Sequence, residues 1–232
     1  MQDIATAIAA WKSSLEHEVE AGRVIARSKI AHKWKATWRG LLLRESVSWR
    51  AQDLLEQSHS LFMSSYLLGA RILMRSALET IAVLIHLNQA TRKVIAGTTD
   101  FHGYSKQTTQ LLLGSRDKST PYDSINILTI LGHASKRYPG LQEMYAALSE
   151  CAHPNYEGML HGYSEADTRN FTTTFQNRWG TLYGDNHLEA IRICMEICIT
   201  EYNDEWTDAF EALERWIEQN DAMLEATKPA ES

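Results

Sequence analysis

Four polar side chains in an otherwise apolar run have the types and spacing to do chemistry together. The segment Ser60–Leu87 is apolar at most positions, and four of its polar residues are Arg71, Arg75, Glu79 and His86. At about 100° per helical residue, these four side chains fall within roughly 80° of arc, on one narrow stripe. A helix that is apolar on its other sides is normally buried, and charged groups are seldom buried without partners. The stripe is therefore expected to lie inside the molecule, facing a partner or a cavity.

Two interpretations of this stripe stay open. In the first, Arg75 and Glu79 form an i,i+4 ion pair that satisfies itself in the core, with His86 hydrogen-bonded nearby. In the second, the stripe lines a pocket where arginine holds an anion or phosphate, and Glu79 or His86 moves a proton. Structural ion pairs are common in helical proteins, so the residue types alone favour the first interpretation.

A second polar group surrounds a proline later in the chain. Its members are Tyr145, Ser149, His153, Glu157 and His161. The residue before a proline is biased away from the α conformation, so His153 is expected at a helix end, free to point inward onto Glu79. A helix beginning at the proline would place His153, Glu157 and His161 on one face, where a metal site with Glu79 and His86 is an alternative. The Glu-x-x-His spacing of di-metal bundles is absent, and we predict neither a metal nor another cofactor.

Together, these residues carry a resemblance to a known group of proteins. The chain has an R-S-x-x-E motif at Arg75–Glu79 and a Y-x-x-L-S-x-x-x-H-P motif at Tyr145–Pro154. This pair resembles a group of uncharacterised prokaryotic proteins that looks related to the HEPN superfamily, and the resemblance covers about Leu54 to His161. The superfamily's hallmark, arginine followed a few residues later by histidine, occurs here only at Arg27–His32, outside that region.

The resemblance implies a function and roles for the residues. Many HEPN proteins are dimeric, metal-independent ribonucleases of toxin–antitoxin and antiviral systems. By this resemblance, Arg75 would stabilise phosphate charge while His153 or Glu79 activates a ribose hydroxyl. The remaining candidates would contribute to binding: Arg71, His86, Tyr145 and Ser149. The alternative is a non-catalytic helical interaction module in which Arg75 and Glu79 form a structural pair.

Composition narrows the class of protein. The 232 residues are 44% hydrophobic and 22% charged, as in an ordinary globular protein, and the formal net charge of −6 argues against a generally basic nucleic-acid binder. The acidic residues near the N-terminus differ from a signal peptide. Ser60–Leu87 is long enough to cross a bilayer, but its central charges make that costly. We therefore expect a cytoplasmic protein with no membrane partner.

A basic, tryptophan-rich segment spans Arg23 to Arg50. Lysines and arginines interleave there with Trp34, Trp38 and Trp49. Such a pattern suits a nucleic-acid strand, through phosphate contacts and base stacking. It also suits a solvated helix whose tryptophans anchor it to the core, and the i,i+4 spacing of Trp34 and Trp38 favours that interpretation. The expected partners are RNA and, in addition, either a second copy of the chain or a partner protein.

Helical periodicity dominates the rest of the chain and predicts an all-α fold. We expect one domain over residues 1–226, a bundle of about five to seven helices, and a disordered tail over 227–232. Ser60–Leu87 is expected to be the central helix, and 164–184 a non-helical insertion, either a loop or a short strand pair. The other expected helices are Ile4–Glu20, Tyr104–Leu113, one starting at Thr120-Pro121, Leu141–Cys151, and Asn186–Glu225 with a break near Asn203-Asp204.

Overall fold

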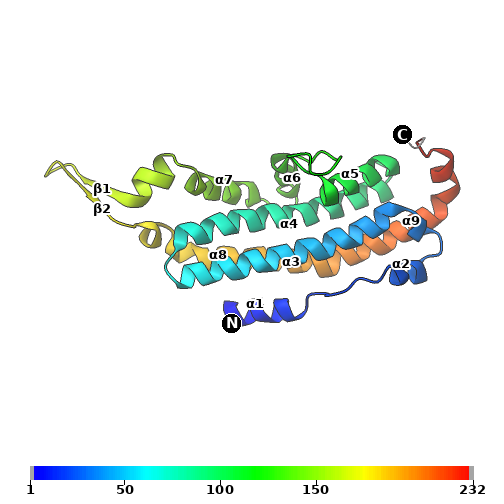
Figure 1. The fold of residues 1–232 in the computed structure, drawn as a ribbon, viewed down its shortest axis with the longest axis horizontal. Coiled ribbons are helices and arrows are strands. Elements are labelled where there is room, and N and C mark those ends of the chain that lie inside the picture. The colour runs from blue at the N-terminus through cyan, green and yellow to red at the C-terminus, as the bar shows by residue number, and fades with distance from the viewer. Residues whose placement is uncertain (1–2, 230–232) are drawn as a thin grey trace.

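The chain folds into an elongated bundle of helices (Figure 1). The computed structural model describes residues 3–229, of which nine α-helices and one two-stranded hairpin are the main elements. The α-helices are α1 (Ile4–Ser13), α2 (Ala21–Arg27), α3 (Lys35–Met63), α4 (Leu67–Ile95), α5 (Phe101–Leu113), α6 (Ile127–Ala134), α7 (Leu141–Ala152), α8 (Trp179–Thr200) and α9 (Trp206–Ala226). The shorter elements are the 3₁₀ turn η1 (Ala31–Lys33), the π-helical turns η2 (Tyr156–His161) and η3 (Glu201–Glu205), and the strands β1 (Ser164–Asp167) and β2 (Thr172–Phe175).

The all-α class is confirmed, with a small hairpin as its β content. The helices of the described part outnumber the expected five to seven because some predicted helices are shorter or divided. The first helix ends at Ser13, and no helix starts at Thr120-Pro121. Thr120 instead donates its hydroxyl to the Leu113 carbonyl, and the next helix begins after the side-chain cap of Asn126.

The predicted continuous helix over Ser60–Leu87 is wrong, because the chain reverses between α3 and α4. Ser65 has a φ of 64°, and the Tyr66 N–H donates to the Leu61 carbonyl at 2.8 Å while Ser65 N–H donates to Phe62. This pair of bonds is a Schellman turn, which normally has glycine at the left-handed position. Serine occupies it here, so the sequence carries no glycine or proline to mark the turn.

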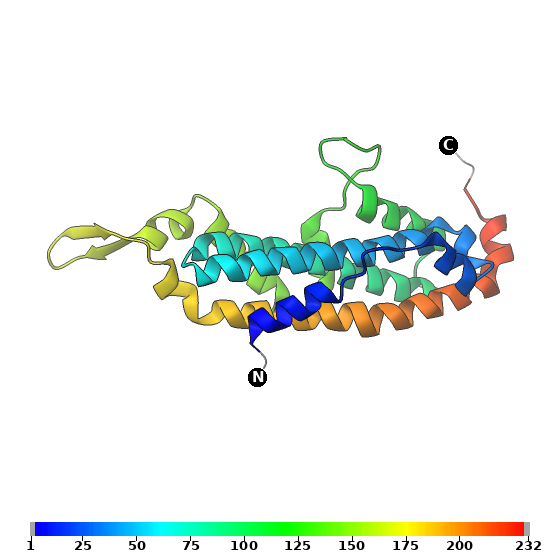
Figure 2. The same cartoon turned by 60° about the horizontal axis from the view of Figure 1, so that its bottom comes forward.

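The long C-terminal helix is confirmed, and it runs as α8, η3 and α9 beside α3 and α4 (Figures 1 and 2). The predicted break near Asn203-Asp204 coincides with η3. A π-helical turn accommodates an extra residue within a helix, and it brings Glu201 into the core, where the side chain is fully buried. The predicted start at Asn186 is too late, since α8 begins at Trp179.

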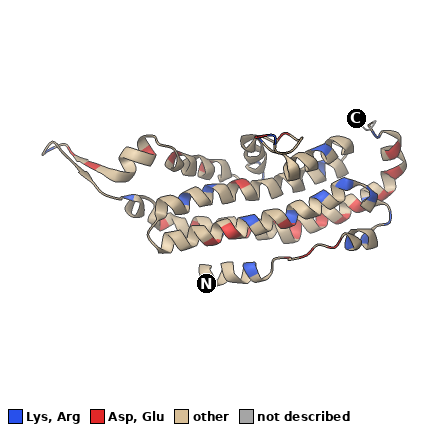
Figure 3. Ribbon diagram, in the orientation of Figure 1, with Lys and Arg blue, Asp and Glu red and all other residues tan. Residues whose placement is uncertain are grey.

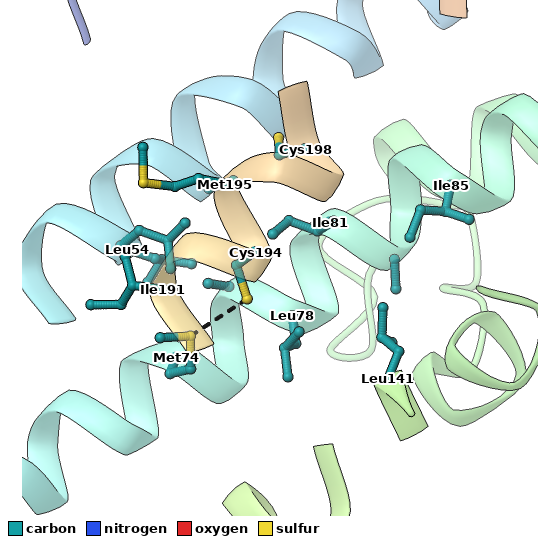
Figure 4. Close-up of a cluster of buried hydrophobic side chains, with 14 of the residues drawn as sticks. Leu54, Met74, Leu78, Ile81, Ile85, Leu141, Ile191, Cys194, Met195 and Cys198 are labelled. Atoms are coloured by element: carbon teal, nitrogen blue, oxygen red, sulfur yellow. Dashed lines mark hydrogen bonds between the residues drawn. The ribbon is translucent and has the colours of Figure 1, made fainter. Parts of the chain in front are cut away.

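Helix α4 is the centre of the bundle. Met74, Leu78 and Ile81 of α4 face Ile191 and Cys194 of α8 in the main core, and Leu54 of α3 closes the cluster (Figure 4). The Cys194 thiol lies 3.6 Å from the Met74 sulfur, and all three cysteines are free and buried. Cys194 and Cys198 behave as small apolar residues of this core.

The basic segment Arg23–Arg50 pairs with the acidic helix α9. Arg27 bonds Glu214 at 2.8 Å and Lys33 bonds Asp221 at 2.7 Å, and Figure 3 shows both charge signs at this end of the bundle. The indole of Trp34 is buried and donates to the same Asp221. This supports the interpretation that the segment is anchored to the core, through Trp34, whereas Trp49 is exposed.

The predicted non-helical insertion is a hairpin in which β1 pairs antiparallel with β2. It extends away from the bundle beyond α7 (Figures 1 and 2). Of the predicted tail, Thr227 caps α9, and 230–232 lie outside the described residues. Within residues 3–229, no helix has both the length and the apolarity to cross a membrane.

Candidate functional site

Four of the seven predicted site residues converge between α4 and α7. Arg75 and Glu79 lie one turn apart on α4, and Tyr145 and Ser149 lie one turn apart on α7. The i,i+4 spacing puts each pair on one helix face, and packing of α7 against α4 brings the two faces together. We call Arg75, Glu79, Tyr145 and Ser149 the α4–α7 cluster.

The guanidinium of Arg75 is the centre of this cluster. Its Nε donates to Ser149 Oγ at 2.8 Å, and its Nη2 donates to Tyr145 Oη at 2.6 Å. The same Nη2 lies 3.3 Å from Glu79 Oε1, to which the Tyr145 hydroxyl donates at 2.9 Å. Among residues 3–229, Nη1 has no hydrogen-bond partner. The guanidinium of Arg75 is therefore held by side chains of both helices, and its Nη1 has free N–H donors.

The α4–α7 cluster is half-open to solvent. The side chains of Arg75 and Glu79 are 27% and 26% exposed, so the expectation of a fully buried pair is wrong. Glu79 also lines a cavity of about 340 Å³ together with Arg50 and Thr80. Tyr145 is buried, and this burial raises the pKa of its phenol, as does its hydrogen bond to Glu79. Tyr145 therefore remains a protonated donor at neutral pH.

His153 does not join the α4–α7 cluster through a direct contact. It ends α7 as predicted, but it is exposed, and no hydrogen bond to its ring forms among residues 3–229. Its backbone is extended, at φ −93° and ψ 148°, because Pro154 follows it. The expectation that His153 points inward onto Glu79 is therefore wrong.

Arg71 lies one turn before Arg75 but uses its donors elsewhere. Its Nε donates to Cys151 Sγ at 3.1 Å, and its guanidinium lies 4.2 Å from the ring centroid of Tyr183. The Tyr183 hydroxyl in turn donates to Glu157. Arg71 thus joins α4, α7 and α8, in a group separate from the α4–α7 cluster.

His86 forms a third group, two helical turns beyond Glu79. Its ring is buried and stacks on His133 of α6, with centroids 5.1 Å apart and planes 7° apart. The two Nδ1 atoms lie 3.2 Å apart, and Gln107 of α5 bonds His86 Nε2 at 2.8 Å. Burial first, then the nearby His133 and Lys93, lowers the pKa of His86 to about 4. The stripe predicted as one unit is therefore divided among three sets of partners.

This neutral histidine predicts a pH dependence of folding. The His86 pKa of about 4 in the folded chain lies below its ordinary value of 6.5. As the pH falls, the unfolded chain takes up a proton on His86 at a higher pH than the folded chain does. The free energy of unfolding is therefore highest above pH 6.5 and falls as the pH decreases toward 4. We expect the free energy of unfolding to drop by about 2 kcal/mol from this group between pH 7 and pH 5, as measured by urea unfolding. In His86→Gln the drop of about 2 kcal/mol between pH 7 and pH 5 should disappear. A variant with the same pH dependence as the unmutated chain would contradict the lowered pKa of His86.

The alternative metal site is not assembled by the described residues. Glu157 accepts from Tyr183, and the ring of His161 stacks on Tyr156 with centroids 5.7 Å apart. Within residues 3–229, no three His, Cys, Asp or Glu side chains gather in a way that would hold a metal ion.

Comparisons with protein-family models, with curated proteins and with solved structures give no match.

Proposed function

We propose that this chain is a HEPN-like helical protein of a prokaryotic defence or toxin-type stress system, which binds RNA at the α4–α7 cluster and cleaves it without a metal ion. The proposal includes a cytoplasmic location and a homodimer. One observation carries it: the R-S-x-x-E and Y-x-x-L-S motifs, far apart in the sequence, meet through Arg75 in hydrogen bonds to Tyr145 and Ser149. Helix periodicity alone does not force that meeting.

The proposed role of Arg75 is to bind a phosphate. Its orientation is fixed by Ser149 and Tyr145, so little side-chain freedom is lost when a ligand arrives. The free Nη1 presents N–H donors to an anion, and charge-assisted bonds from arginine to phosphate are strong. An arginine held in this way also stabilises the charge that develops on phosphate oxygens during transfer.

The proposed cleavage uses the ribose hydroxyl as nucleophile. The 2′-oxygen bonds to phosphorus, the bond from phosphorus to the 5′-oxygen breaks, and a base takes the hydroxyl proton. Glu79 is the base within the α4–α7 cluster. His153 lies one turn beyond Ser149, about 6 Å further along the axis of α7, and it is free to face a bound nucleotide. His153 would then supply the proton that the departing 5′-oxygen gains.

Cleavage in a chelator is the test of this proposal. The purified full chain is incubated with end-labelled single-stranded RNA in excess EDTA, and products are separated on a denaturing gel. The proposal expects fragments ending in a 2′,3′-cyclic phosphate, as follows from attack by the 2′-hydroxyl. RNA that stays intact at all protein concentrations would contradict the catalytic part, and activity that requires added metal would contradict the metal-independent mechanism.

A non-catalytic interaction module is the second candidate, and two observations favour it. Most donors and acceptors of the α4–α7 cluster already satisfy one another, as in a structural pair. The basic segment pairs with α9 through Arg27 and Lys33, which leaves less free positive charge for RNA. A chain that leaves RNA intact in this cleavage assay, and that also fails to bind labelled RNA, would support this candidate.

A further inference from the structure

A projecting arm gathers exposed apolar side chains. We define the arm as residues 156–175, comprising η2 and the hairpin, which extend away from the bundle (Figures 1 and 2). Six large apolar or aromatic residues of the arm are exposed: Tyr156, Met159, Leu160, Tyr163, Phe171 and Phe175. Phe171 is 94% exposed and Phe175 is 76% exposed. Apolar side chains gathered on one exposed element mark an interaction surface.

The hairpin itself requires further contacts to be stable. A two-stranded hairpin is marginally stable in water unless more strands or a helix pack on it. All of β2 is exposed, and in β1 only Ser164 is buried. The described sheet contains these two strands alone, so each strand has one edge without a strand partner.

The two edges of the hairpin differ in charge. Strand β1 carries Glu165 and Asp167, and charged residues of this kind keep an edge from pairing with another strand. Strand β2 has the sequence Thr-Thr-Thr-Phe over 172–175, with no charge and with high β propensity throughout. The β2 edge is therefore the unprotected one.

We propose that two copies of this chain pair through the β2 edges of their hairpins, antiparallel, in one four-stranded sheet. Pairing that uses all of Thr172–Phe175 sets Phe175 of each copy opposite Thr172 of the other, and Thr173 opposite Thr174. No charged residue lies within this register. Pairing through β1 edges would instead place four acidic side chains, Glu165 and Asp167 of each copy, in one small sheet, and charged residues of this kind disfavour edge pairing.

A second copy suits this edge because the contact is self-complementary. An isologous two-fold contact pairs one surface with itself, and an uncharged antiparallel strand meets that requirement. Four residue pairs alone bury less than the roughly 800 Å² per partner of a standard interface. The exposed apolar side chains of η2, such as Met159 and Leu160, are available to supply the rest of the buried interface area. This inference does not rest on RNA binding or cleavage.

The test is the oligomeric state of the full chain, measured by sedimentation velocity from about 1 to 100 μM, the range in which a modest interface assembles. We expect a concentration-dependent dimer. Phe175→Glu should raise the dissociation constant about tenfold or more, since it places a charge on the pairing edge and removes an apolar side chain from the contact. The matched control is Leu128→Glu on α6, another exposed apolar position, which should leave the dimer unchanged.

Hydrogen exchange distinguishes this edge from other contacts. Amides of 172–175 should become more protected as the concentration rises in the unmutated chain, and not in Phe175→Glu. A chain that stays monomeric at all concentrations would overturn the proposal. A dimer of equal strength in the unmutated chain and in Phe175→Glu would overturn it as well.

Discussion

Arg137→Met is expected to lower the free energy of unfolding by about 3 kcal/mol, as measured by urea unfolding at pH 7. Arg137 Nε donates at 2.6 Å to Glu201, whose side chain is fully buried within η3. Tyr138 and Asn88 also donate to this carboxylate, at 2.8 and 2.7 Å. Removing the cation leaves a buried negative charge with neutral donors only, which is strongly unfavourable.

Two variants control this prediction. Arg92→Met removes an exposed arginine paired with Glu205, and such surface pairs contribute about 1 kcal/mol or less. Adding Glu201→Gln to Arg137→Met should restore part of the lost stability, because the buried group is then neutral. An Arg137→Met chain as stable as the unmutated one would contradict the buried-charge argument.

His153→Ala is expected to lower the rate of RNA cleavage about 100-fold or more, the range of proton-transfer catalysis. The fold should be unaffected, because His153 is exposed and its ring forms no hydrogen bond within residues 3–229. The rate is measured on labelled RNA in EDTA, and stability by urea unfolding of the same samples. His161→Ala is the matched control, a nearby histidine that stacks on Tyr156 and should retain activity. Equal rates in the two variants would remove His153 from the proposed mechanism.

The sequence predicts the helical class and the two residue pairs that make up the α4–α7 cluster, because both depend on spacing along a helix. Arg75 and Glu79 lie on one face at i,i+4, as Tyr145 and Ser149 do, and two such faces meet when their helices pack. The resemblance supplied the pairing of the two motifs. The break at Asn203-Asp204 was likewise predicted and occurs as η3.

Other features could not be predicted, for definite physical reasons. The turn at Ser65 uses serine in a left-handed conformation, where glycine is the usual sequence marker. The direction of His153 depends on the backbone after Ala152, and no helix period constrains it. The partners of His86, which are His133 and Gln107, come from other helices, so only the three-dimensional packing identifies them.

The most direct test of the central claim compares RNA binding by Arg75→Met and Arg92→Met, using fluorescence anisotropy of a labelled single-stranded RNA in EDTA. Each variant removes one positive charge from a partly exposed arginine of α4 that is paired with a glutamate. The account predicts that Arg75→Met weakens binding about tenfold or more, while Arg92→Met binds like the unmutated chain. The same affinity in both variants would contradict the claim that the α4–α7 cluster binds a phosphate of RNA.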